Sequence, residues 1–209
     1  SINLLRARGI PRIRIVTGHL DDQYRDQFDA QPDVELIHNP AFAETGSLES
    51  LMTGLDGLSG HVVLLESDVI YESRALSPVE PGVTRLMVSG KTGATDEVYV
   101  WSRKGMNGTP AFDFMSKDIS ARTGAHFGEL MGITCFAAPQ VAALRTAGQA
   151  VLAENPGADY EDAVCALARD TDIEAVLLRD LAWTEIDNEA MYARAVEAVW
   201  PVIQSRDPA

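Results

Sequence analysis

The stretch His-Val-Val-Leu-Leu-Glu-Ser-Asp at residues 61–68 sets the fold that this sequence predicts. Residues 61–65 form an apolar run of strand length, and the carboxylates of Glu66 and Asp68 follow it directly. In open α/β sheets, ligands bind at the carboxyl ends of the strands. Glu66 and Asp68 are therefore candidates for a functional site at the end of a buried strand.

Two more apolar runs of strand length, at 13–17 and 34–37, precede this stretch. A polar segment with helical character, 21–28, lies between them. A second one follows Thr45-Gly46-Ser47, where apolar residues are spaced by three and four as far as residue 55. Strands that alternate with helices over short connections are typical of right-handed βαβ units. We therefore predict an α/β fold with a mostly parallel sheet flanked by helices.

The rest of the chain predicts further elements and no linker or internal repeat. Alternation predicts an antiparallel pair of strands at 85–88 and 98–101, within the segment 84–102. The other expected elements are strands at 130–136, 173–178 and 183–187 and helices at 139–154, 160–169 and 188–204. The prediction is one domain over residues 1–209.

Composition and charge exclude several classes of protein. The chain has 209 residues, of which 46% are hydrophobic and 23% charged, as in an ordinary globular protein. Its net charge of -14 argues against a nucleic-acid partner, because phosphate backbones are bound by an excess of Lys and Arg. A nucleotide substrate stays compatible with this charge, because a metal ion can bridge acidic residues and phosphates.

The sequence also predicts a cytoplasmic protein without a membrane partner. Cys135 and Cys165 have no CxxC spacing, which favours two reduced thiols in a reducing compartment. No apolar run approaches the ~20 residues needed to span a bilayer, and no signal peptide opens the sequence. A homo-oligomer is compatible with the sequence, which carries no signal for or against one.

Two strand-end carboxylate pairs are the strongest chemical candidates. Asp68 after its strand can hold Mg²⁺, or it can cap the next turn or helix. Glu185 and Asp187 close the strand predicted at 183–187, where Asp187 can equally serve as the N-cap or a first-turn acid of the next helix. A metal that bridges phosphates takes ligands from more than one strand, so the two pairs together favour a metal site.

Weaker candidates come from a helix start and from aromatic residues. Thr45-Gly46-Ser47 precedes a predicted helix, whose N-terminal N–H groups suit an anion or a base edge. Trp101 and Trp183 lie near strand ends, where a ring face can receive an ammonium group or simply pack in the core. The chain has no G-x-S-x-G, H-E-x-x-H, P-loop or G-x-G-x-x-G motif, so the usual hydrolase, zinc protease, ATPase and dehydrogenase anchors are absent.

The order of these motifs resembles the nucleotidyltransferases of the GT-A-like fold, nearest the phosphocholine and 2-aminoethylphosphonate cytidylyltransferases. The resemblance runs through nearly the whole chain. The matching segments are Gly9 to Gly18, Asn39-Pro40 with Thr45 to Leu51, Leu65 to Val69, Gly128 to Ile133, and Trp183 to Asn188. It implies a Rossmann-like, mostly parallel mixed sheet of the nucleotide-diphospho-sugar transferase type.

The resemblance also implies an activity and a set of site residues. The implied reaction joins CMP from CTP to phosphocholine, 2-aminoethylphosphonate or a related small amine and releases pyrophosphate. Asp68 and Asp187 would be the catalytic residues that bind Mg²⁺. The nucleotide would contact Asn39, Thr45, Gly46 and Ser47. The acceptor would contact Glu66, Trp101, Glu129, Trp183 and Glu185.

One part of the family pattern has no counterpart in this sequence. The family begins with a strand and a glycine-rich loop, roughly L-A-A-G-x-G-x-R, that wraps the triphosphate. We expect this N-terminal strand and phosphate loop to be missing here. Two other functions stay open: a sugar-1-phosphate nucleotidyltransferase, and a non-catalytic nucleotide-binding domain that lost its phosphate loop. Acidic and aromatic acceptor residues favour an amine, whereas Asn, Gln and backbone groups favour a sugar.

Overall fold

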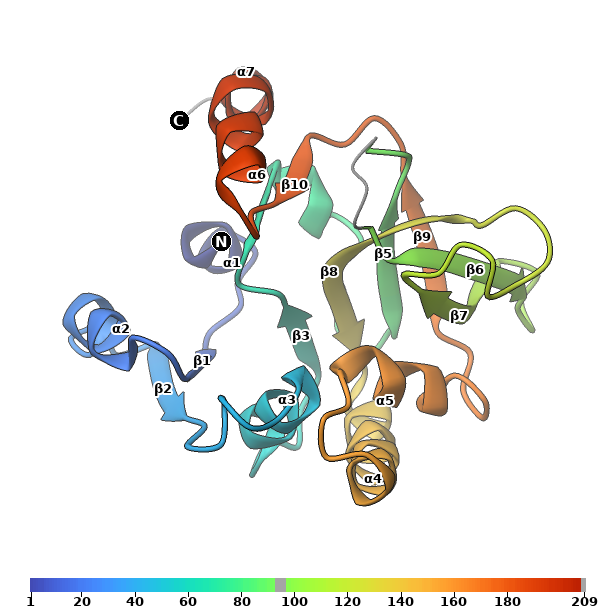
Figure 1. Ribbon diagram of the computed structural model, residues 1–209, viewed down its shortest axis with the longest axis horizontal. Helices are drawn as coiled ribbons and strands as arrows, with labels where there is room; N and C mark the ends of the chain where they lie inside the picture. The colour runs from blue at the N-terminus through green and yellow to red at the C-terminus, as the bar shows by residue number, and fades with distance from the viewer. Residues whose placement is uncertain (93–96, 208–209) are drawn as a thin grey trace. The chain divides into compact units, whose positions relative to one another are not determined.

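The computed structural model describes residues 1–92 and 97–207 (Figure 1). Residues 93–96, inside the segment expected to hold two antiparallel strands, lie outside the described residues. The chain divides into two compact units, each built from two separate stretches of sequence. The first unit is Ser1–Gly60 with Pro139–Asp170, and the second is His61–Ala138 with Thr171–Ala209. The expectation of a single domain stays a prediction.

The first unit contains the predicted βαβ arrangement. Its elements are α1 Ile2–Ala7, β1 Ile13–Thr17, α2 Asp21–Phe28, β2 Val34–His38, α3 Ser47–Leu55, α4 Ala138–Glu154 and α5 Tyr160–Leu167. β1 and β2 pair in parallel, from Ile13 opposite Val34 to Thr17 opposite His38. The apolar spacing of α3 is confirmed, because its leucines at 48, 51 and 55 are all buried.

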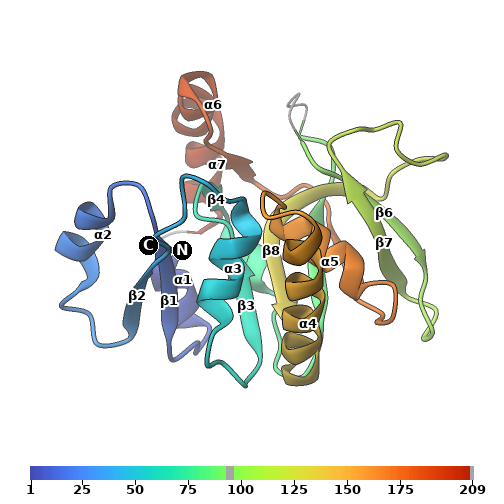
Figure 2. The ribbon, with the colours of Figure 1, turned by 60° about the horizontal axis from the view of Figure 1, so that its bottom comes forward.

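Helices α3, α4 and α5 lie side by side within the first unit, as Figures 1 and 2 both show. Gly148 of α4 lets this helix approach α3 closely. A Cβ atom at Gly148 would come within 2.7 Å of the Met52 sulfur, a distance that real Cβ atoms do not reach. This packing supports the loop between β2 and α3, which carries the candidate nucleotide-binding residues.

The second unit consists of strands and a C-terminal helical segment. Its strands are β3 Val62–Leu65, β4 Val69–Tyr71, β5 Arg85–Ser89, β6 Tyr99–Lys104, β7 Pro110–Ser116, β8 Gly128–Phe136, β9 Glu174–Leu178 and β10 Trp183–Glu185. Its helical elements are η1 Ser73–Leu76, α6 Glu189–Arg194, η2 Ala195–Val199 and α7 Trp200–Arg206. The main sheet has the order β3-β8-β5-β9-β7-β6, and β6 pairs back onto β8. Five strands thus close into a ring with β3 outside it, and β4 pairs with β10 separately.

The expectation of a mostly parallel sheet is wrong for the second unit. β5 and β9 are parallel, whereas the other described pairings in this sheet are antiparallel. The prediction extends the βαβ pattern before residue 65 to the whole chain, but among the described residues no helix lies between β5, β6, β7 and β8. Strands joined without a crossover helix run antiparallel.

The predicted antiparallel partners, 85–88 and 98–101, do not pair with each other. β5 lies between β8 and β9, and β6 pairs with β7, a strand that the sequence did not predict. A tight turn explains this pairing, because the Gly105 N–H donates to the Thr109 carbonyl oxygen at 2.9 Å and reverses the chain. One edge of β6 is therefore hydrogen-bonded to β7 of the local hairpin, and the expected partner at 85–88 does not pair there.

The helix predicted at 188–204 is interrupted by a π-helical turn, η2. Pro201 follows this turn and has no N–H to donate to the preceding turn, where its ring would also collide with a carbonyl oxygen. Ala195, Val199 and Ile203 are buried on this helical segment, while Met191 is only partly buried. No helix among the described residues is long and apolar enough to cross a membrane.

Candidate active site

Five carboxylates of the second unit form the candidate active site, which we call the carboxylate cluster: Glu66, Asp68, Glu97, Glu185 and Asp187. Glu66 and Asp68 follow β3, Glu97 precedes β6, and Glu185 and Asp187 lie at the end of β10. The backbone joins the two predicted strand ends directly, because the Ile186 N–H donates to the Asp68 carbonyl oxygen at 2.9 Å. The structure therefore brings together the two carboxylate pairs that the sequence had predicted separately.

Burial, followed by mutual repulsion, raises the pKa of two carboxylates in the cluster, Glu185 and Asp68. Burial is the largest cause that raises the pKa of Glu185 from 4.5 to about 8, followed by Glu66, Glu97, Asp187 and Asp68. The pKa of Asp68 is also raised, first by desolvation and then by Asp187, against a lowering effect of its own backbone N–H. Every charged neighbour that shifts the pKa of Glu185 is another carboxylate. Such a cluster favours the binding of a cation.

Exposure increases across the cluster from Glu97 to the two aspartates. Glu97 is buried, and Glu66 and Glu185 are half-buried. Asp68 and Asp187 are exposed. A hydrated metal ion or a phosphate can therefore reach the aspartates from solvent, while the glutamates provide further acidic groups at greater depth.

Gly132 of β8 provides the space that Glu66 occupies. Its φ of 65° lies in the left-handed region, and a Cβ atom there would come within 2.6 Å of the Glu66 carboxyl carbon. The Glu66 N–H donates to the Gly132 carbonyl oxygen at 2.9 Å, so backbone and side chain are both fixed at this point. The segment Gly128 to Ile133 thus contributes to the site in two ways. Gly132 leaves space for Glu66, and Glu129 adds a carboxylate.

Thr92 holds two of the acidic side chains. Its N–H donates to Glu129 Oε2 at 2.7 Å, and its hydroxyl donates to Glu97 Oε1. Glu129 is buried on β8. Glu97 was not predicted from the sequence, because neither a strand end nor a motif marks it. Its place follows from the contact with Thr92 and from its electrostatic effect on Glu185.

The alternative roles of the two aspartates as helix caps are not observed. The α6 N-cap is Asn188, whose side-chain oxygen accepts the Met191 N–H at 3.0 Å. Asp68 is followed by strand β4 rather than by a helix. Both aspartates are therefore available for another role.

The residues of the cluster fit a magnesium ion. Among the residues that the structure describes, no group of three or more His, Cys, Asp or Glu side chains is arranged to hold a metal. Mg²⁺ does not need one, because it commonly binds through one or two carboxylates and completes its shell with waters and substrate phosphates. Asp68 and Asp187, exposed and adjacent, are the oxygen donors suited to this mode.

The two tryptophans have other neighbours than the cluster. Trp101 is buried on β6, and its ring lies 6.0 Å from that of Phe114 and 6.5 Å from that of His126. Trp183 is buried on β10 opposite Tyr71 and lines a pocket with several basic residues. Their assignment to an acceptor site stays a prediction.

The candidate nucleotide-binding residues lie together in the first unit, in the loop between β2 and α3. Asn39 is buried and spans the loop, donating to Ser50 Oγ at 3.1 Å and accepting the Ala41 N–H at 2.9 Å. The Thr45 hydroxyl donates to the Ala41 carbonyl oxygen at 2.8 Å. Both side chains therefore shape this loop whether or not they touch a nucleotide.

Gly46 and Ser47 connect α3 to α5. A Cβ atom at Gly46 would come within 2.6 Å of the Gly157 carbonyl oxygen, so only glycine fits there. The Ser47 N–H and hydroxyl both donate to Asp159 Oδ1, at 3.2 and 3.1 Å. The N-terminus of α3, expected to receive an anion, thus faces a carboxylate of the protein itself. The nucleotide-binding role of these residues stays a prediction.

Comparison with known proteins places the fold. No protein-family model matches the chain. The inositol-1-phosphate CTP transferase from T. maritima matches 100% of this chain and 83% of its own, with a TM-score of 0.73 and 14% identity. The CTP:phosphocholine cytidylyltransferase from Streptococcus pneumoniae matches 94% and 82%, with a TM-score of 0.72 and 17% identity. A UDP-glucose pyrophosphorylase complexed with UDP-glucose matches 96% and 85%, with a TM-score of 0.68 and 12% identity. The chain therefore has a fold that nucleotidyltransferases use.

Proposed function

We propose that this protein is a Mg²⁺-dependent nucleotidyltransferase that joins CMP from CTP to a small phosphorylated or phosphonylated amine. The observation that carries the proposal is the carboxylate cluster, in which mutual repulsion and burial raise the pKa of Glu185 to about 8. Such a site is stabilised by a bound cation, whether a metal ion or an ammonium group. The shared fold of cytidylyltransferases supports the same reaction class.

The reaction needs little covalent chemistry from the protein. An oxygen of the acceptor's phosphate or phosphonate forms a bond to the α-phosphorus of CTP, the bond from that phosphorus to the bridging oxygen breaks, and pyrophosphate leaves. Positioning and charge neutralisation dominate reactions of this type. A Mg²⁺ ion supplies neutralisation of the phosphate charge when it is bound.

Within the cluster, depth suggests a division of roles. Asp68 and Asp187 are exposed and are our proposed ligands of Mg²⁺. Glu66, Glu97 and Glu185 lie deeper and are suited to attract the amine of the acceptor. Thr92 links Glu129 to this group, because its N–H donates to Glu129 and its hydroxyl donates to Glu97.

The direct test is pyrophosphate release by the purified protein with Mg²⁺, across four nucleoside triphosphates. Phosphocholine, 2-aminoethylphosphonate, inositol-1-phosphate and glucose-1-phosphate serve as acceptors. We expect release with CTP and one amine acceptor. Release with a sugar or polyol phosphate alone would instead identify a sugar-1-phosphate type of nucleotidyltransferase. The similar folds of the inositol-1-phosphate CTP transferase and the UDP-glucose pyrophosphorylase favour this second candidate.

Three variants assign the activity to the cluster. Asp68→Ala and Asp187→Ala should each reduce turnover by at least about 100-fold, because charge stabilisation is the main catalytic contribution. Asp170→Ala removes an exposed carboxylate outside the cluster and should leave turnover unchanged. Equal activity of all three variants would remove the proposed role of the cluster, and no release under any condition would contradict the function itself.

A further inference from the structure

Basic residues gather in one pocket of this acidic protein. The chain has 17 Lys and Arg residues and a net charge of -14, yet Lys91, Arg179, Arg194 and Arg206 all line a single pocket of about 530 Å³ in the second unit. This volume lies within the range of about 300–1,000 Å³ that is usual for small-molecule sites. We call it the cationic pocket.

The pocket lies where the topology of the sheet favours a ligand. β5 and β9 are parallel and end side by side, with Ser89 opposite Leu178. The residues that follow both strand ends line the pocket, together with one face of the C-terminal helical segment. Ligands of α/β sheets bind at the carboxyl ends of parallel strands.

Much of the positive charge in the pocket is not neutralised by the protein. Arg206 Nη1 binds the buried Glu72 carboxylate at 2.8 Å and also donates to the Asp180 carbonyl oxygen at 2.6 Å. Arg194 donates to a neutral group, the Thr92 carbonyl oxygen, at 3.0 Å. The side chains of Lys91 and Arg179 make no hydrogen bond or ion pair with any residue that the structure describes, although the Arg179 carbonyl oxygen accepts from Arg74 at 3.0 Å. Asp180 supplies one carboxylate to the lining, which leaves the pocket positive.

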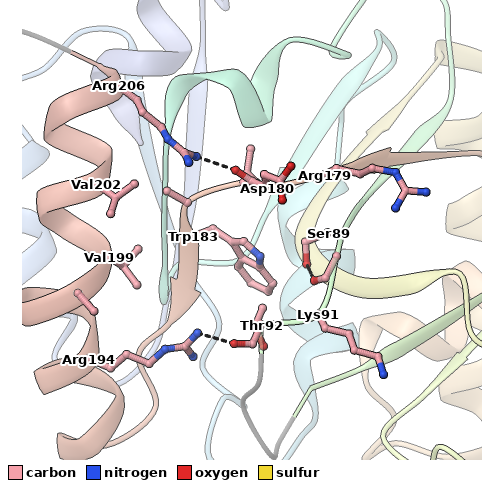
Figure 3. A pocket seen from close by; sticks show the side chains of 14 residues that line it. Ser89, Lys91, Thr92, Arg179, Asp180, Trp183, Arg194, Val199, Val202 and Arg206 are labelled. Carbon is pink, nitrogen blue, oxygen red and sulfur yellow. Dashed lines mark hydrogen bonds between the residues drawn. The ribbon is translucent and has the colours of Figure 1, made fainter.

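The side chains surround an apolar floor. Figure 3 shows Trp183 between the two hydrogen-bonded arginines, Arg194 and Arg206, with Lys91 and Arg179 on the opposite side of the pocket. The indole of Trp183 is 3% exposed, and valine side chains of the helical segment continue the apolar surface. A ligand here therefore meets positive charge beside an apolar lining that includes Trp183 and two valines.

We propose that the cationic pocket binds a small organic anion, in which a phosphate or carboxylate is attached to an apolar body that lies against Trp183. Guanidinium groups bind both oxyanions in a bidentate manner. The pocket adjoins the carboxylate cluster, because Thr92 lines the pocket and donates to Glu97 of the cluster, but the charges of the two sites have opposite signs. The inference does not depend on the nucleotidyl-transfer reaction.

Calorimetric titration tests this inference with phenyl phosphate as the probe. We expect saturable binding at one site, with inorganic phosphate and phenol each at least about tenfold weaker, because each lacks one half of the recognised chemistry. Phenyltrimethylammonium should not bind the pocket. The absence of saturable phenyl phosphate binding to the wild-type protein overturns the proposal.

A charge-matched pair of variants locates the site. Lys91→Ala combined with Arg179→Ala removes two exposed cations of the pocket and should weaken phenyl phosphate binding by at least about tenfold. Lys104→Ala combined with Arg122→Ala removes two exposed cations elsewhere in the second unit and should change it by less than about twofold. Equal losses in the two double variants would show a general charge effect and reject the site. Thermal unfolding of both variants verifies that each is folded.

Discussion

Gly132 leaves the space that the Glu66 side chain occupies. The residue combines a φ of 65° with a neighbouring carboxylate that leaves no space for a methyl group. Two costs therefore fall on any substitution: the left-handed backbone conformation of a non-glycine residue, and the displacement of Glu66. The two costs can be separated, because other glycines of the same unit have a positive φ and open space around them.

Gly132→Ala should lower the free energy of unfolding by about 2–4 kcal/mol, measured by chemical denaturation. Gly82→Ala is the matched control, because Gly82 has a φ of 82° with nothing within 4 Å. It should lose only about 1–2 kcal/mol from backbone conformation. If the two losses were equal, the contact with Glu66 would have no energetic weight.

The raised pKa of Glu185 gives the protein a characteristic dependence on pH. Between 4.5 and about 8, the folded state holds a proton on Glu185 that the unfolded state has released. Stability therefore falls as pH rises through this interval, in the absence of a bound cation. Glu185→Gln should flatten the decrease, as measured by thermal unfolding from pH 5 to pH 8.5.

Glu154→Gln, at the end of α4 in the first unit, is the control for this change, and its pH dependence should follow that of the wild type. Added Mg²⁺ should raise the melting temperature of the wild-type protein most at the upper end of the range, where the cluster carries most charge. If the melting temperature of Glu185→Gln depended on pH as that of the wild type does, Glu185 would not cause the decrease in stability.

The site residues differ in how far the sequence could predict them. Asp68 and Asp187 follow strands, and this position alone made them candidates. Glu97 belongs to the same cluster but follows no strand, and its place depends on a contact with Thr92 that no local pattern contains. The sequence therefore predicts carboxylates that directly follow a strand, and it does not predict Glu97, which lies outside the strands.

At the scale of elements, helices α3 and α5 cap one another. Asp159 is the N-cap of α5, but its carboxylate accepts hydrogen bonds from the Ser47 N–H and hydroxyl of α3. In return, Ser47 Oγ accepts the Tyr160 N–H of α5 at 2.9 Å. Each helix thus accepts a hydrogen bond from an N–H group in the first turn of the other. Without its neighbour, each helix N-terminus would lose this hydrogen-bond acceptor.

Ser47→Ala should therefore lower the free energy of unfolding by about 1 kcal/mol, as the loss of an N-cap does. Ser59→Ala, at an exposed position after α3, should change it by less than about 0.5 kcal/mol. Denaturant titrations of both variants measure the difference. If Ser47→Ala left the free energy of unfolding unchanged, the reciprocal caps would not contribute to stability. A loss of CTP affinity in that variant would then reflect a nucleotide-binding role of Ser47.

Elements with a strong local period were predictable, and those defined by long-range pairing were not. The runs at 13–17 and 34–37 became parallel strands, and the leucine spacing of α3 became a buried face. β7 was missed, because it opens with Pro110 and gains its strand conformation from pairing with β6. The π-helical turn before Pro201 was likewise hidden in an uninterrupted helical pattern.

At the scale of the whole molecule, charge is distributed unevenly within the second unit. One part of it gathers carboxylates and another gathers basic side chains, although the chain as a whole is strongly acidic. The net charge of -14 argues against a nucleic-acid partner, but it does not indicate whether a local anion site exists. The sequence indicated the acidic part through its strand ends, whereas the basic part combines residues between 91 and 206 that no motif joins.

The closed ring of strands in the second unit contains two short strand pairings. β7 meets β9 at one residue pair and β6 meets β8 at two, whereas β5 pairs with β9 over five residues. We therefore expect the hairpin β6–β7 to unfold locally as one cooperative unit while β5, β8 and β9 stay paired. In native-state hydrogen exchange, its amides should lose protection together and before those of the three remaining strands. Simultaneous exchange of all five strands would mean that the ring opens only by global unfolding.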